Sequence, residues 1–155
     1  MVANPARVAG DLLGRLQLIP GWRAFTQNVA PLSALASTPG WEDSDGRKTQ
    51  PGAKAIGLAQ WGSAMTVAAV VTDAVRGAPW PDPGIDPSGF IWLTWRIGDS
   101  AELALELHAD MNRQTYKWTS MRDGTPRSHS SESLGDVVEA LRAVMVGASA
   151  PPAKS

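Results

Sequence analysis

The sequence predicts an α+β fold, with helices in its first half and, in its second half, an antiparallel meander of three or four strands closed by a C-terminal helix. Two patterns support this. Strand-like runs separated by turn residues fill residues 89–122, and apolar side chains recur at helical spacing from residue 134 onward. The length of 155 residues is that of one ordinary domain. We therefore expect a single domain over residues 1–147 and a disordered tail over 148–155.

The helical part is expected over residues 5–76. Asn4 and Pro5 are typical of a helix start and predict a first helix near residues 5–18. Residues 53–76 predict a long helix, although the β-branched run within it leaves a strand open as the alternative. Between them the periodicity fades, and only one or two helical turns are expected. The apolar face of the long helix comprises Leu58, Trp61, Met65, Ala68, Val71 and Val75.

Residues 77–88 are expected to form a stiff linker. Four prolines fall within residues 79–87, which excludes a helix and favours an extended chain. The linker leads into residues 89–147, the meander and its helix. Ser133 is a suitable cap for that helix, and Gly147 is expected to end it.

The strand register follows from the turn chemistry around Gly98. A glycine at the first position of a two-residue turn predicts a type II′ hairpin, which pairs Thr94 with Leu103 and Trp92 with Leu105. This register gives the sheet two different faces. The face expected under the C-terminal helix carries Phe90, Trp92, Leu103, Leu105, Leu107, Tyr116 and Trp118. The other face carries Ile91, Leu93 and Trp95 beside Glu102, Glu106 and Lys117.

The second face is too apolar to meet only water. Two explanations stay open: the helices of the first half cover it, or it docks a partner. The candidate partner-binding residues are Ile91, Leu93, Trp95, Glu102, Glu106 and Lys117.

Composition excludes several functions. The formal charge of -1, from 14 basic and 15 acidic residues, argues against a protein that coats nucleic acid. The absence of cysteine excludes disulfides, thiolate catalysis and Cys-ligated metals. Charged residues interrupt the apolar start of the chain, so no secretory signal is expected. Residues 55–72 carry no charge, but glycine and polar side chains favour a buried helix over a membrane span. We expect a cytoplasmic protein.

No catalytic, cofactor-binding or metal-binding pattern stands out. His108 and His129 lack the carboxylate or cysteine spacing of a metal site. No glycine-rich phosphate-binding motif occurs either. The leading hypothesis is a non-enzymatic binding or regulatory protein whose partner is another protein, with homo-oligomers also open. The alternatives are a small enzyme that uses Glu102, Glu106 or His108, and a nucleic-acid-binding protein. The basic residues of the last hypothesis are Arg47, Lys48, Arg113, Arg122 and Arg127.

The order of these elements resembles small bacterial and mobile-element proteins. In those proteins a G-W-x-D-G segment precedes a helix, a Pro-rich linker, a G-x-I-x-L-x-W strand, an L-x-L-E strand and a closing helix. Here the matching segments include residues 40–46, 89–95 and 103–107, and the likeness covers residues 40–146. The resemblance implies an origin in a bacterium, phage or plasmid, but no activity and no functional residue. This chain departs from the pattern at Thr94, where glutamate is common.

Overall fold

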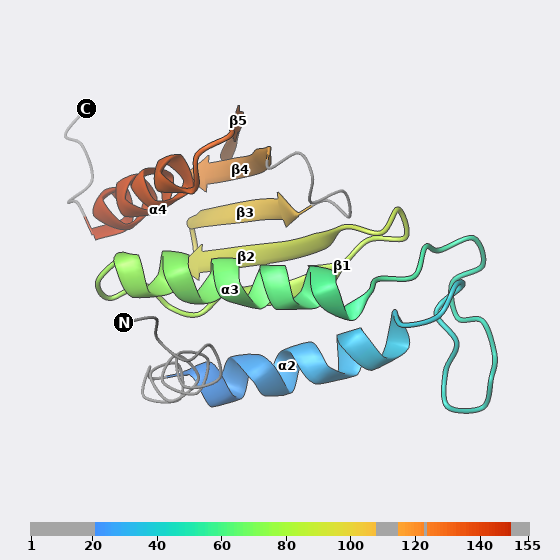
Figure 1. The fold of residues 1–155 in the computed structure, drawn as a ribbon. Coiled ribbons are helices and arrows are strands. Elements are labelled where there is room, and N and C mark those ends of the chain that lie inside the picture. The colour runs from blue at the N-terminus through green and yellow to red at the C-terminus, as the bar shows by residue number, and fades with distance from the viewer. Residues whose placement is uncertain (1–20, 108–114, 123, 150–155) are drawn as a thin grey trace, which may run out of the picture.

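The computed structural model of the protein describes residues 21–107, 115–122 and 124–149. These residues form three helices and a five-stranded antiparallel sheet with strand order β1-β2-β3-β4-β5, as Figure 1 shows. The α+β prediction is therefore confirmed. The helices are α2 (Trp22–Leu35), α3 (Leu58–Ala74) and α4 (Leu134–Ser149). The strands are β1 (Asp82–Ile85), β2 (Ile91–Ile97), β3 (Ala101–Leu107), β4 (Tyr116–Arg122) and β5 (Thr125–Ser131).

Helix α2 occupies a segment where the sequence predicted only a turn or two. Its buried residues, Phe25 and Val29, lie four positions apart and face the core. Pro31 lies inside the helix and lacks the N–H that would bond the carbonyl four residues earlier. The helix nevertheless continues past this exposed proline to Leu35. The helix predicted near residues 5–18 lies outside the described residues.

Helix α3 begins at Leu58, five residues later than predicted. The backbone N–H of Gly57 donates to the Gln60 side-chain oxygen at 3.0 Å, which satisfies a donor at the helix start. Residues 66–71 are helical, so the strand alternative is wrong. Leu58 is 83% exposed and does not belong to the buried face, whereas Val67 does.

The hairpin between β2 and β3 differs from the predicted one by a single residue. Ile97 pairs with Ala101, so the connection has three residues, and Leu93 pairs with Leu105. The predicted two-residue turn is therefore wrong. Because side chains alternate along a strand, this one-residue shift moves every β3 side chain to the other face. The observed register places Ile91, Leu93 and Trp95 on the same face as Leu103, Leu105 and Leu107, and it keeps the carboxylates of Glu102 and Glu106 off that face.

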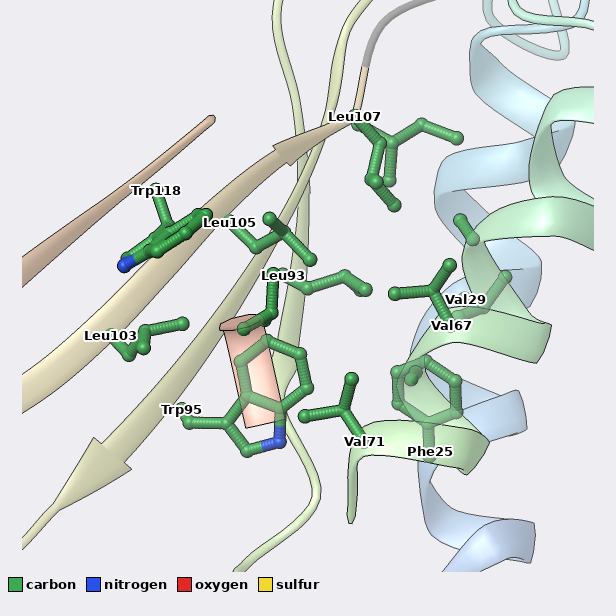
Figure 2. Packing of buried hydrophobic residues seen from close by; sticks show 14 of the residues in the cluster. Phe25, Val29, Val67, Val71, Leu93, Trp95, Leu103, Leu105, Leu107 and Trp118 are labelled. Carbon is green, nitrogen blue, oxygen red and sulfur yellow. The ribbon is translucent and has the colours of Figure 1, made fainter. Parts of the chain in front are cut away.

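The apolar face of the sheet is the core of the protein. Its central side chains are fully buried, and Trp95 has no exposed surface. In Figure 2, Val67 and Val71 of α3 point toward Leu93 and Trp95. Helix α4 adds Val137, Leu141 and Val144 to the same cluster. The chain's own helices therefore cover this face, which decides between the two explanations left open by the sequence. The buried strand residues are Ile91, Leu93, Trp95, Ala101, Leu103, Leu105, Leu107 and Trp118.

The sheet extends beyond the predicted meander on both sides. Part of the Pro-rich linker pairs with β2 as strand β1, and its Pro83 is tolerated because β1 is an edge strand. On the other side β5 pairs along the whole of β4. The sequence also predicts a four-residue loop at residues 109–112, which would pair Leu105 of β3 with Tyr116. In the structure Leu105 pairs with Trp118 instead. A shift of two residues keeps Trp118 on the predicted side of β4.

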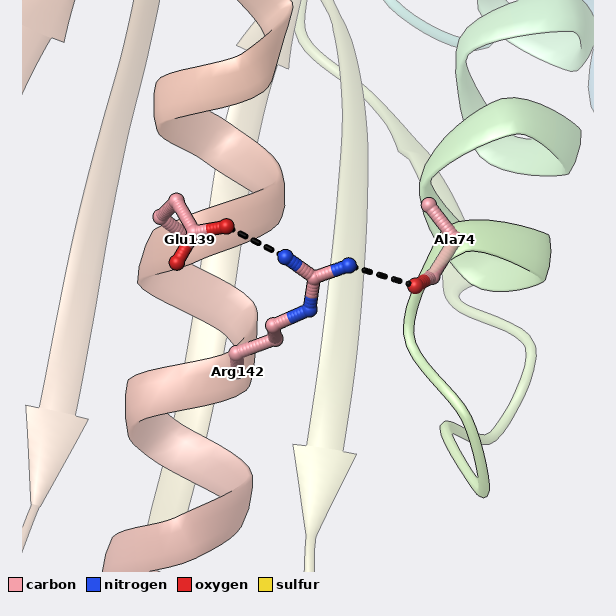
Figure 3. A network of polar contacts seen from close by, with 3 residues as sticks. All are labelled: Ala74, Glu139 and Arg142. Atoms are coloured by element: carbon pink, nitrogen blue, oxygen red, sulfur yellow. Dashed lines mark hydrogen bonds and ion pairs between the residues drawn. The ribbon is translucent and has the colours of Figure 1, made fainter.

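Helices α3 and α4 are joined by a polar contact at one end. Figure 3 shows that the Arg142 guanidinium of α4 donates to the Ala74 carbonyl oxygen at 3.0 Å and also pairs with Glu139. A cation at the last carbonyls of a helix is favourable because it satisfies an unpaired acceptor. Helix α4 continues to Ser149, past the predicted end at Gly147. No helix in the described ranges has the length and apolar content needed to cross a membrane.

An aromatic cluster connects α2 to the segment before β1. The ring of Trp80 stacks on Phe25 with centroids 5.1 Å apart and lies 5.4 Å from the Trp22 ring. Gly21, at φ 89°, lies against this cluster, where an added Cβ would come within 2.3 Å of the Trp80 ring. Only glycine fits here without displacing the indole.

We predict that Thr72→Val lowers the free energy of unfolding by about 1–3 kcal/mol, because a buried donor loses its acceptor. The Trp95 indole N–H donates to the Thr72 hydroxyl at 3.1 Å inside the core. Thr66→Val on the exposed side of α3 is the matched control and should change stability by no more than about 0.5 kcal/mol. Urea unfolding followed by circular dichroism measures both. Equal effects of the two substitutions would contradict the assigned bond.

We also predict that Gly21→Ala destabilises the protein more than Gly46→Ala. Both glycines have positive φ, at 89° and 77°, so alanine costs about 1–2 kcal/mol at each. No atom lies within 4 Å of a Cβ added at Gly46, whereas Trp80 obstructs one at Gly21. Overpacking should therefore add about 1–3 kcal/mol at Gly21 alone. Thermal unfolding of the two variants gives the comparison, and equal losses would rule out the close approach of Trp80.

Candidate binding surfaces

The six predicted partner-binding residues do not share one face. Ile91, Leu93 and Trp95 are buried under the helices, so the prediction that they form an accessible surface is wrong. Glu102 and Glu106 lie on the opposite face, as their pairing and burial pattern require. Lys117 lies directly across from Glu106, so these two residues share one face, as predicted. The six residues are divided between the two faces because the β2–β3 connection is one residue longer than predicted.

The face opposite the core is the first candidate surface, which we call the open face. Its apolar side chains include Trp92, Ala104 and Met121, which are half-buried and do not belong to the core cluster or to the partly buried residues packed on it. A hollow of about 350 Å³ lies beside Trp92. Its lining comprises Trp92, Glu106, Lys117, Trp118, Thr119, Ser128, His129 and Ser130.

The open face carries charges of both signs as well as Trp92. Arg96 forms an ion pair with Asp82 of β1, with a nitrogen-to-oxygen distance of 3.4 Å. Glu106 of β3 is the direct cross-strand neighbour of Lys117, an arrangement that favours opposite charges. The surface thus offers an indole among hydrogen-bonding and charged groups, which is typical of protein–protein contact sites.

A groove between β5 and α4 is the second candidate surface. It has a volume of about 660 Å³ and lies on the helix-bearing side of the sheet. Helix α4 packs mainly on β3 and β4, so β5 extends past it and leaves this space beside the helix. The lining residues are Trp118, Ser120, Arg122, Thr125, Arg127, His129, Asp136, Glu139, Ala140, Ala143 and Val144.

The charged groups of the groove differ in how they are paired. On α4, Glu139 pairs with Arg142, and Asp136 accepts a hydrogen bond from the Ser131 hydroxyl. On the strands, Arg122 and Arg127 are exposed and make no ion pair with any described residue. The carboxylates of α4 in the groove therefore have partners, whereas the two arginines on the strands have no anionic partner among the described residues.

The Trp118 side chain lies at the base of the groove. The His129 ring stacks on it with centroids 5.8 Å apart. The Trp118 residue is 7% exposed, and its indole N–H has no acceptor among the described residues. In Figure 2 the indole nitrogen is at the end of the ring away from Leu105.

The residues of the enzyme hypothesis are not brought together. Glu106 lines the hollow beside Trp92, whereas Glu102 lines another hollow near the β2–β3 connection. Four residues along a strand separate their alpha carbons by about 13 Å. His108 lies outside the described residues. Within the described ranges, no three His, Asp or Glu side chains cluster as metal ligands would.

The residues of the nucleic-acid hypothesis also fall in separate places. Arg122 and Arg127 line the groove, while Arg47 and Lys48 belong to the loop after α2. Figure 1 places that loop at the opposite end of the molecule from β5 and α4. Arg113 lies outside the described residues.

Sequence reasoning missed Trp92 and the groove for different reasons. Trp92 was assigned to the face under α4 because the turn chemistry indicated the wrong register. The matching alternation of apolar residues at 91, 93 and 95 and at 103, 105 and 107 would have indicated the right one. The groove depends on where α4 lies over the sheet, and the sequence contains no comparable signal for this.

The comparisons with known protein families, with curated proteins and with solved structures found no match for this chain. The resemblance to small bacterial and mobile-element proteins therefore stays a prediction.

Proposed function

We propose that the protein is a non-enzymatic binding protein that acts as an accessory or inhibitory subunit on another protein, through the open face of its sheet. The observation that carries the proposal is the position of Trp92. This side chain is half-buried on a face that contributes nothing to the described core. Tryptophan is enriched at the energetic centres of protein interfaces, where its large ring is buried on binding.

The neighbours of Trp92 support the same proposal. The hollow beside it has hydroxyl groups from β4 and β5 and the charged groups of Glu106 and Lys117. Such groups can fix the orientation of a partner, while the indole supplies apolar area. A cytoplasmic location and a bacterial, phage or plasmid origin belong to the same proposal.

The proposal predicts that Trp92→Ala weakens binding of the partner by at least about 30-fold, the effect of losing a central interface residue. The partner is first identified by affinity capture from the source cell and mass spectrometry. Its affinity for purified wild-type and variant protein is then measured by calorimetry. Trp95→Ala is unsuitable because Trp95 is a core residue, so that variant would test folding.

Leu58→Ala is the matched control for Trp92→Ala. Leu58 is a large exposed apolar side chain on α3, and its loss should leave the affinity unchanged. Circular dichroism must show that both variants fold. A folded Trp92→Ala variant that binds the purified partner as tightly as the wild-type protein would refute the assigned surface.

A further inference from the structure

We propose that the groove between β5 and α4 binds an extended, acidic segment of another protein, which adds a strand to the free edge of β5. This site lies on the other side of the sheet from Trp92 and is independent of the function proposed above. Three features of the groove support it: a strand edge that no described segment pairs with, an apolar base, and two arginines with no ionic partner among the described residues.

The strand edge is the first feature. β5 is the last strand of the sheet, and it pairs with β4 over seven residues. Thr125 to Ser130 are all exposed, and no described segment pairs with the outer side of β5. In an antiparallel ladder, alternate residues of an edge strand direct their N–H and C=O groups outward. Such an edge accepts an added strand through main-chain hydrogen bonds.

The base of the groove is the second feature. Ala140, Ala143 and Val144 of α4 line the groove together with Trp118, and their spacing of three and four residues puts them on one side of the helix as an apolar strip. Alternate side chains of a strand added to β5 point to this side of the sheet, where the strip can bury them. The small alanine side chains leave the space that makes the groove about 660 Å³ in volume.

The charges are the third feature, and they select the kind of segment. Arg122 and Arg127 are directed to the groove side of the sheet and have no anionic partner among the described residues, so carboxylates of a bound segment can pair with them. Pairing of β5 with a second copy of itself would instead bring two sets of Arg127 and His129 together. A nucleic acid carries a phosphate at every nucleotide and would place some of them against Asp136 and Glu139, whereas a peptide can carry its carboxylates beside the arginines alone.

A synthetic ten-residue peptide is the probe for this site. Valine and glutamate alternate at its odd positions and threonine fills its even positions, so that valine and glutamate lie on the same side of the added strand. Two matched peptides separate the contributions: one has lysine in place of glutamate, and the other has N-methyl groups on alternate backbone nitrogens. We expect the glutamate peptide to bind in fluorescence anisotropy at low ionic strength and the other two to bind at least about fivefold more weakly. Equal binding of all three peptides would overturn the proposal.

A charge reversal locates the site. Arg127→Glu should weaken binding of the glutamate peptide by about fivefold or more and strengthen binding of the lysine peptide. Arg23→Glu, an equal charge change at an exposed position of α2, should do neither. Trp92→Ala should leave peptide binding unchanged, so that failure here and failure of the proposed function are distinguishable. Unchanged binding to a folded Arg127→Glu variant, or tighter binding of a ten-nucleotide single-stranded DNA than of the glutamate peptide, would overturn the proposal.

Discussion

The pairing of β2 with β3 places six large apolar side chains on one face of the sheet. Full burial of each contributes roughly 1.5–3 kcal/mol, far more than the preference of a glycine for one turn type. The register one residue away would bring Glu102 and Glu106 beside Trp95 under the helices, and a buried unpaired carboxylate is strongly unfavourable. The side-chain pattern therefore determines the register, and the connection at residues 98–100 lengthens to three residues to permit it.

The two candidate surfaces are consequences of this register. Because β2 and β3 direct their large apolar residues to the helices, Trp92 is left on the open face. Trp95 is fixed in the core by its hydrogen bond to Thr72 of α3. Helix α4 lies over β3 and β4, and β5 extends past it. A single sheet thus offers an indole-centred face on one side and an edge groove on the other.

The sequence predicts the fold where one periodicity dominates and fails where two signals compete. Apolar residues at steps of three and four identify α3 and α4, and the alternation of apolar residues identifies β2 and β3. Proline is unfavourable inside a helix and inside a central strand, so Pro31 argued against α2 and Pro83 against β1. Strand β1 tolerates Pro83 because it is an edge strand. Of the site residues, Glu106 and Lys117 were correctly placed together. Trp92 was placed on the wrong face, because its face depends on whether the β2–β3 connection has two or three residues.

The register of β2 and β3 is tested most directly by cross-strand backbone contacts in a nuclear Overhauser spectrum of the folded, unmodified protein. The structure predicts proton contacts between Leu93 and Leu105 and between Trp95 and Leu103. It also predicts contacts between Leu105 and Trp118 across the next pair of strands. Contacts that join Thr94 to Leu103 and Trp92 to Leu105 would show the two-residue turn, and would contradict both the buried position of Trp95 and the open position of Trp92.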